Sequence, residues 1–210
     1  MIPNNLFQSR VCYETMSNTF PGADGAWRNR YLLMRHGHSQ ANQEGRIISS
    51  PALGLTGFGL SSQGHAQLDQ LLADWRWARP RRILHSDFLR TAETAERVAT
   101  HFGLALTVEP RLRERHFGEL EGQSDARYAE VWALDAQDPT LRQGGVEAVA
   151  EVAARMRAVI DEMEARHRDE TILLVSHGDP LQILLTALEG RALSLHRERE
   201  PLAPASITSL

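Results

Sequence analysis

Two short apolar runs in the chain, residues 31–34 and 171–175, each stop shortly before a His-Gly pair. The first run is followed by the letters RHGHSQAN and the second by SHGD. A short apolar run that ends abruptly in polar residues is typical of a strand buried on both faces of a parallel sheet. Because ligands of open α/β sheets bind at the carboxyl ends of the strands, the two runs predict one site that both strands build.

Helix and strand patterns alternate along the rest of the chain. Apolar residues recur with helical spacing in residues 61–75, 91–102, 125–136, 146–166 and 180–188. Further strands are expected at residues 81–85, 104–108 and 205–210, and irregular segments at residues 43–59 and 110–122. This alternation predicts an α/β fold, a three-layer α/β/α sandwich with a mostly parallel central sheet.

The start of the chain has a different composition. Residues 1–30 are polar, contain prolines and glycines, and show no sustained period. We therefore expect residues 1–30 to form an irregular N-terminal extension and residues 31–210 to form a single α/β domain. Four aromatic residues of the extension are candidates to pack back on the domain: Phe7, Tyr13, Phe20 and Trp27.

Composition excludes several classes of function. The net charge is −4, so the chain as a whole offers no basic surface and no nucleic-acid partner is expected. Cys12 is the only cysteine, which excludes an intrachain disulfide framework and a cysteine-based metal cluster. No apolar run approaches the ~20 residues of a membrane span, and the N-terminus lacks the pattern of a secretory signal. The sequence predicts a cytoplasmic protein with no membrane partner, and it leaves monomer and homodimer open.

His36 is the candidate nucleophile of the predicted site. A neutral imidazole can attack phosphorus and hold the phosphoryl group covalently, which divides one displacement into two easier steps. Arg35 would disfavour the protonated imidazole and could grip phosphoryl oxygens through its planar guanidinium. Ser39 and Asn42 could add neutral donors. The alternative for His36 is a turn in which the histidine caps a carbonyl group.

Three further residues extend this candidate site. Arg90 opens the helix that leaves the 81–85 strand and could reach over the sheet edge, although a helix arginine is also often solvated. Glu114 lies in a charged loop, where it could protonate a leaving oxygen or belong to a surface ion-pair cluster. His177 could stabilise transition-state charge, and the helix that starts near Asp179 would point amide groups at the same place.

Together these motifs resemble those of the histidine phosphatase superfamily, which contains the cofactor-dependent phosphoglycerate mutases. The motifs follow the family's order from Tyr31 to Leu210: Arg35-His36-Gly37 with Ser39 and Asn42, Ser86 with Arg90, Leu112–Gly122 with Glu114, and Ser176-His177-Gly178. The resemblance implies a phosphohistidine at His36. The other catalytic residues that it implies are Arg35, Arg90, Glu114 and His177. The phosphate-binding residues that it implies are Arg35, Ser39, Asn42, Arg90, His177 and Gly178.

The resemblance also implies a small-molecule phosphomonoester as substrate, with no metal and no cofactor. Three features depart from the family pattern. His38 stands where the family usually has Glu or Gln, and it receives no assigned role. Residues 1–30 have no counterpart in the family. The chain ends at Leu210, where relatives commonly continue with more strand, so one edge of the sheet is expected to be short.

Hydrolysis is favoured over a mutase reaction, which is the main alternative. Mutases of this family carry a longer segment between the acid and the second histidine, with extra basic residues that seat a bisphosphorylated cofactor. The arginines in this segment of the chain are expected mostly on solvated helix faces, and they are Arg127, Arg142, Arg155, Arg157, Arg166 and Arg168. A shorter segment gives a more open pocket, which admits water and secures a bisphosphate poorly.

The sequence leaves two other interpretations of its function open. One is a non-catalytic relative that binds phosphorylated ligands, which would normally show a broken motif. The other is a metal-dependent hydrolase that uses His36 and His38, since alternate histidines on a loop can chelate a transition metal. The pair His85 and Asp87 does not resemble a zinc signature. Four other histidines are expected at the surface: His65, His101, His167 and His196.

Overall fold

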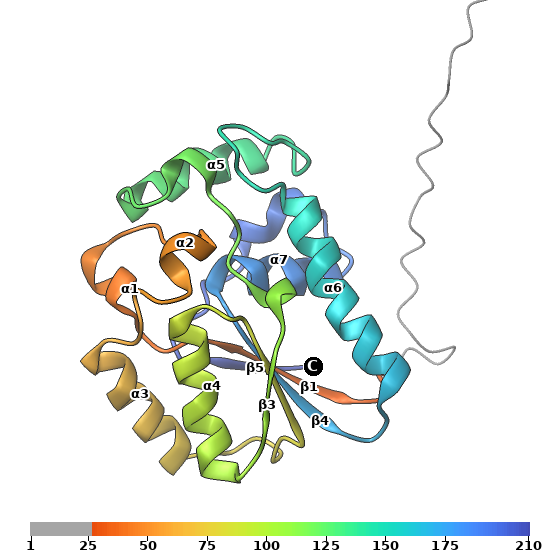
Figure 1. The fold of residues 1–210 in the computed structure, drawn as a ribbon. Helices are drawn as coiled ribbons and strands as arrows, with labels where there is room; N and C mark the ends of the chain where they lie inside the picture. The colour runs from red at the N-terminus through yellow and green to blue at the C-terminus, as the bar shows by residue number, and fades with distance from the viewer. Residues whose placement is uncertain (1–26) are drawn as a thin grey trace, which may run out of the picture.

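The computed structural model of the chain describes residues 27–210 (Figure 1). Most of the predicted extension, residues 1–30, therefore lies outside the described residues. The part that is described packs against the domain. The ring of Trp27 meets the ring of Tyr31 edge-on, with centroids 5.7 Å apart. The first strand begins at Arg30.

A five-stranded sheet forms the middle layer. Its strands are β1 (Arg30–Arg35), β2 (Arg82–His85), β3 (Leu106–Val108), β4 (Thr171–Ser176) and β5 (Ile207–Ser209). Their order is β3-β2-β4-β1-β5, and β5 alone runs antiparallel to its neighbour. The mostly parallel sheet is confirmed, whereas the strands predicted at 104–108 and 205–210 are shorter than expected.

The longer helices cover both faces of this sheet, which confirms the three-layer prediction (Figure 1). One face carries α6 (Val149–Arg166) and α7 (Gly178–Leu188). The other face carries α3 (Ser62–Ala73) and α4 (Leu89–Phe102). No helix within residues 27–210 is both long and apolar enough to cross a membrane.

The apolar run of β1 is explained by burial on both sides. Tyr31 and Leu33 belong to the core beneath α6 and α7. Leu32 and Met34 belong to the core beneath α3 and α4. A strand in this central position needs apolar residues at successive positions, because each successive side chain enters one or the other core.

The parallel pairing of β1 with β4 brings the two His-Gly pairs together. Arg35 lies opposite Ser176 in the register, and a histidine directly follows the last residue of each strand. The backbone N–H of His36 donates to the carbonyl of Ser176 at 3.0 Å. His36 and His177 therefore leave neighbouring strands at the same edge of the sheet, as the sequence predicted.

Shorter elements lie around the carboxyl ends of the strands. They are α1 (Gln40–Glu44), α2 (Pro51–Gly54), α5 (Tyr128–Asp135) and the 3₁₀ turns η1 (Pro110–Leu112), η2 (Gly118–Leu120), η3 (Asp125–Arg127) and η4 (Leu193–Glu198). The expectation of an irregular segment at 43–59 was wrong in part, because a helix with proline in its first turn forms there. The helix predicted from residue 146 begins later, because Val146 forms a β-bridge with Phe117.

The buried carboxylate of Glu164, on α6, accepts hydrogen bonds from residues at the start of β1 and just before it. Glu164 is 5% exposed and accepts hydrogen bonds from the Tyr31 hydroxyl at 2.7 Å and the Arg28 amide at 2.7 Å. It also accepts from the backbone and side-chain amides of Asn29, at 3.2 and 2.9 Å. Burial alone would raise the pKa of Glu164, but these donors outweigh burial and lower it below 4.5.

We expect Glu164→Gln to lower the free energy of unfolding at pH 7 by about 1–2 kcal/mol, because the charged acceptor is lost. The lowered folded-state pKa means that this stabilisation is present above the unfolded-state pKa and is lost as the pH falls through the folded-state pKa. Urea unfolding at pH 7 and at successively lower pH measures the difference. Glu96→Gln, on the exposed side of α4, is the control. A difference between Glu164→Gln and parent that grows on acidification would contradict this account.

Candidate active site

A cavity of about 220 Å³ lies at the carboxyl ends of β1 and β4. Most of the residues predicted from the sequence line it, and these are Arg35, His36, Ser39, Asn42, Arg90, Glu114 and Gly178. His177 lies directly behind this wall, fully buried, with its ring centroid 5.2 Å from that of His36. The structure thus brings the predicted site residues together from four separate segments of the chain.

His36 presents one free ring nitrogen to the cavity. Its Nδ1 lies 2.7 Å from the carbonyl oxygen of Gly37, and because a carbonyl can only accept, Nδ1 carries the ring hydrogen. Nε2 is then unprotonated, and it accepts a hydrogen bond from Arg90 Nε at 3.2 Å. Burial is the main cause that lowers the pKa of His36 well below its ordinary value, and the charges of Arg90 and Arg35 add to it. His36 is therefore neutral at physiological pH, with a lone pair at Nε2.

The second histidine is held by the same arginine. Arg90 Nε also donates to His177 Nδ1 at 3.2 Å, so the ring hydrogen of His177 lies on Nε2 and points to Ser86 Oγ, 2.9 Å away. Burial, followed by the charge of Arg90, lowers the pKa of His177 well below its ordinary value. Arg90 is 3% exposed, so the alternative of a solvated helix arginine does not hold.

Two guanidinium groups at this cavity each have a buried donor without a partner among residues 27–210. Arg90 Nη2 donates to the carbonyl of Ile48 at 3.0 Å, and Arg35 Nη1 donates to the carbonyl of Leu202 at 2.5 Å. Arg90 Nη1 and Arg35 Nε are buried, and neither has a hydrogen-bond partner within residues 27–210. An unpaired buried N–H of a charged group costs several kcal/mol at most sites, so these donors suit an anion that would occupy the cavity.

The carboxyl group of Glu114 lies beside both Arg90 and His177. Its Oε2 lies 3.8 Å from Arg90 Nη2 and 3.9 Å from His177 Nδ1, and its Oε1 accepts from the backbone of Arg115 at 2.9 Å. Burial raises the pKa of Glu114 to about 7, against the opposing charge of Arg90. A carboxyl with this pKa can give and take a proton near neutrality. It is not part of a surface ion-pair cluster.

The cavity is also lined by Ser39, Asn42 and Gly178, which stabilise the local structure as well. Ser39 caps α1, with its Oγ accepting from the Asn42 amide at 3.2 Å and donating to Asn42 Oδ1 at 2.9 Å. Gly178 starts α7, and a Cβ there would lie 3.3 Å from the Arg35 guanidinium. The glycine therefore lets Arg35 lie directly over the first turn of the helix.

His38 points away from His36. Its Nδ1 bonds to Ser61 Oγ at 2.8 Å, at the start of α3, and it does not line the cavity. Across residues 27–210 no three His, Cys, Asp or Glu side chains are grouped so that they could hold a metal ion. His85 bonds to the carbonyl of Ser86 through Nδ1, and Asp87 pairs with Arg113.

The outer wall of the cavity consists of residues that sequence reasoning missed. Tyr128 and Trp132 of α5 stack with ring centroids 5.2 Å apart, and the Arg197 guanidinium lies 3.6 Å from the Trp132 ring centre. Gln182 of α7 and the rim residue Arg46 complete this side. The one available signal was the spacing of two aromatic residues by one helical turn, and it does not distinguish a ligand wall from a core contact.

One expectation about a polar residue was wrong, and the burial of a second was not foreseen. His196 was expected at the surface, but it is fully buried, with Nε2 3.6 Å from Asp179 Oδ1. Arg115, in the loop expected to be charged and irregular, is also fully buried and pairs with Asp135. Each residue is buried by segments far away in sequence, so no local pattern could have shown it.

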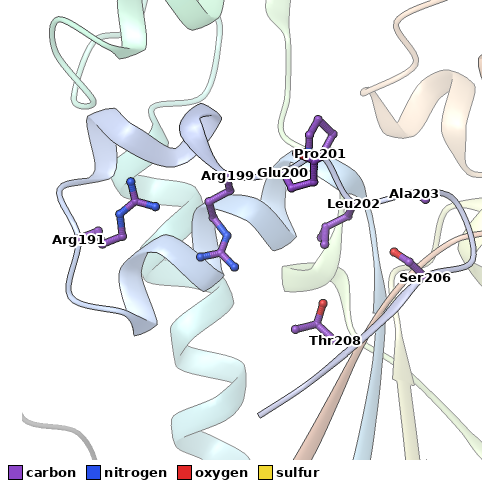
Figure 2. A pocket seen from close by; sticks show the side chains of 8 residues that line it. All are labelled: Arg191, Arg199, Glu200, Pro201, Leu202, Ala203, Ser206 and Thr208. Carbon is purple, nitrogen blue, oxygen red and sulfur yellow. The ribbon is translucent and has the colours of Figure 1, made fainter. Parts of the chain in front are cut away.

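A second hollow, of about 450 Å³, lies across the Pro201–Leu202 segment from this cavity (Figure 2). Figure 2 shows two arginines there, and each has an acidic neighbour: Arg191 pairs with Glu198 and Arg199 with Glu189. No histidine or cysteine lines this hollow. This hollow therefore offers no imidazole or thiol nucleophile.

Comparison with known proteins agrees with this geometry. Residues 31–210 match the histidine phosphatase superfamily (branch 1). A probable phosphoglycerate mutase GpmB of Photorhabdus laumondii is 34% identical over 80% of this chain and 77% of its own. A glucosyl-3-phosphoglycerate phosphatase of Mycobacterium tuberculosis is 29% identical over 76% of this chain and 74% of its own.

A solved structure also resembles this fold. The native structure of a mycobacterial glucosyl-3-phosphoglycerate phosphatase superimposes with a TM-score of 0.73 and 26% identity, and the match covers 86% of this chain and 88% of that one. The resemblance therefore extends from sequence motifs to the arrangement of strands and helices. This chain belongs to the histidine phosphatase superfamily, branch 1.

Proposed function

We propose that the protein hydrolyses a small phosphorylated metabolite through a phosphohistidine formed on His36. The observation that carries this proposal is the neutral, buried imidazole whose free Nε2 faces Arg90, with the Glu114 carboxyl beside it. A nucleophile, cationic donors for phosphoryl oxygens and a proton donor thus meet at one place. These are the parts that a double displacement at phosphorus requires.

In the first step, the phosphate oxygens take the unused donors of Arg35 and Arg90. This also draws the Arg90 N–H away from His36 Nε2 and frees its lone pair. Nε2 then forms a bond to phosphorus while the bond from phosphorus to the ester oxygen breaks. Glu114, protonated near neutrality, gives its proton to the departing oxygen, so that the leaving group departs as a neutral alcohol.

In the second step, a water molecule replaces the alcohol. Glu114, now a carboxylate, takes a proton from this water as its oxygen forms a bond to phosphorus. The bond from phosphorus to His36 Nε2 breaks, the electron pair returns to the ring, and inorganic phosphate leaves. His177, fixed by Arg90 and Ser86, holds the shape of the phosphoryl pocket in both steps.

A mutase reaction is the second candidate, and the shape of the cavity argues against it. None of the arginines between Glu114 and His177 lines the cavity. Arg115, the most buried of them, pairs with Asp135, and Arg155 donates to the carbonyls of Arg111, Arg113 and Glu114 and so supports the loop. Arg46 and Arg197 at the outer wall could meet a second phosphate, but a cavity of about 220 Å³ has little room for a bisphosphorylated cofactor.

The proposed reaction uses groups of this chain and requires no metal or cofactor, so a chelator should leave the activity intact. A compact cavity favours a small phosphomonoester over a protein or nucleic-acid substrate. The relatives named as phosphatase and probable mutase also have small phosphorylated metabolites in their names. The cytoplasmic location and the choice between monomer and homodimer stay predictions from the sequence.

The proposed intermediate can be trapped directly. We expect an alkaline quench of the enzyme with radiolabelled substrate to capture an acid-labile, alkali-stable phosphoryl group on the peptide that contains His36. The variant His36→Asn should lose this label. His38→Asn should keep it, because the ring of His38 lies against Ser61 outside the cavity. Label on His177, or retention of label in His36→Asn, would contradict the assignment.

The acid role of Glu114 predicts a dependence on the leaving group. Glu114→Gln should slow hydrolysis of an alkyl phosphomonoester by about 10²–10⁴-fold and of p-nitrophenyl phosphate much less, because nitrophenolate leaves without a proton. Glu119→Gln, on the exposed side of the same loop, is the control. A burst experiment must first show that phosphorylation of His36 limits both rates. Equal losses on both substrates would assign the proton to another group.

A further inference from the structure

A group of ionisable residues, most of them buried, lies in and behind the cavity wall and takes no part in the two displacement steps. It consists of Arg115, Asp135, Asp179, His196 and Arg197 and is called the charge cluster below. Arg115 and His196 are fully buried, Asp135 is 2% exposed and Asp179 is 7% exposed. Buried ion pairs are weak contributors to stability, because desolvation offsets much of their attraction. A contribution to stability therefore does not explain why these residues are grouped here.

Arg115 links this cluster to the candidate acid. It follows Glu114 in the chain, and its backbone amide donates to Glu114 Oε1. Its guanidinium forms two bonds with Asp135, at 2.6 and 2.8 Å, and a longer one with Asp179 Oδ2 at 3.4 Å. One buried cation therefore has two carboxylate partners, of which Asp135 takes the closer contacts.

Asp179 is the acidic member of the cluster that lines the cavity, and Arg197 lines it as well. It lies in the first turn of α7, two residues after His177, and lines the same cavity as Glu114. Arg197 Nη1 donates to its Oδ1 at 3.3 Å, and His196 Nε2 lies 3.6 Å from the same oxygen. Burial would raise the pKa of Asp179, but His196 and the arginines lower it to about 2. Asp179 is thus a permanent negative charge in the wall of the site.

We propose that Asp179 is a positioning residue that keeps the Glu114 carboxyl protonated in the resting enzyme. The proposal rests on the proposed function, in which Glu114 supplies the proton to the leaving group. An ionised Glu114 would place a second negative charge in the cavity shared with Asp179, and that arrangement is unfavourable in a buried site. The effect acts through space, since the contacts of Asp179 are with Arg115, Arg197 and His196.

The other groups that face Glu114 show why such a charge is needed. From α4, Arg90 lies 3.8 Å away, and Arg35 contributes a second positive charge from β1. His177, at the end of β4, is neutral, Tyr128 faces the carboxyl from α5, and from α6 Arg155 donates to the backbone carbonyl of Glu114.

These cations favour the ionised carboxylate of Glu114, as does the Arg115 amide. Burial and the charge of Asp179 raise the pKa of Glu114 against them. Without Asp179, burial alone would oppose the two arginines. The pKa of Glu114 should therefore fall when the Asp179 charge is removed.

The direct test is a carbon-13 NMR titration of the Glu114 side-chain carboxyl in substrate-free protein labelled at glutamate, with Glu114→Gln used to assign the signal. The parent should titrate with a midpoint near 7. In Asp179→Asn the midpoint should fall by roughly one unit, and in Asp179→Glu, which keeps the charge, it should stay raised. This readout needs no activity, so it remains informative if the proposed reaction is wrong.

Asp135→Asn is the matched control. It also removes one carboxylate from Arg115, but Asp135 does not line the cavity. Its effect on the Glu114 midpoint should be clearly smaller than that of Asp179→Asn. Equal shifts in the two variants, or an unchanged midpoint in Asp179→Asn, would overturn the proposal. If Asp179→Asn fails to fold, Asp179→Ser, which also removes the charge, replaces it: the midpoint should again fall, and an unchanged midpoint would overturn the proposal.

The pH profile gives the corresponding kinetic readout. For an alkyl phosphomonoester, the alkaline limb of kcat/KM should move to lower pH in Asp179→Asn, because Glu114 loses its proton earlier. The profile for p-nitrophenyl phosphate should move much less. A uniform loss of activity on both substrates, with the alkaline limb unmoved, would show a purely structural role for Asp179.

Discussion

The hydrogen bond from His36 Nδ1 to the carbonyl of Gly37 is the interaction on which the site depends. It assigns the ring hydrogen to the nitrogen that faces the backbone and leaves Nε2 free toward Arg90. Burial and two neighbouring arginines then prevent protonation of that nitrogen. In the proposed reaction, the cations that would bind the phosphate also keep the nucleophile neutral, so one arrangement would serve both binding and attack.

The register of the sheet determines where the side chains of the site lie relative to one another. Parallel pairing of β1 with β4 fixes the register in which Arg35 meets Ser176, and with it the relation of His36 to His177. Arg90, at the start of α4, then reaches both rings with one Nε. These groups start from strand ends and helix starts that pack on two apolar cores, and such elements hold side chains more precisely than loops do.

The inner half of this site could be predicted from the sequence, because strand ends and motif spacing are local signals. The apolar runs located β1 and β4, and four motifs in order located His36, Arg90, Glu114 and His177. The outer half could not be predicted in this way. Trp132, Arg197 and the buried pair of Arg115 with Asp135 depend on contacts between distant segments, and charged residues in a loop are usually solvated. The loop prediction at 43–59 was wrong in part for a related reason, since α2 forms there with its buried Gly54 against the distant Phe88 ring.

The most direct test of the account is the protonation state of His36 in the substrate-free enzyme. Long-range proton–nitrogen NMR correlations of labelled imidazoles distinguish the two neutral tautomers and the imidazolium. The account predicts that His36 carries its hydrogen on Nδ1 and stays neutral from about pH 8 down to below its ordinary pKa of 6.5. A hydrogen on Nε2, or a ring that is protonated at pH 6.5, would contradict it, because Nε2 would then have no lone pair with which to attack phosphorus.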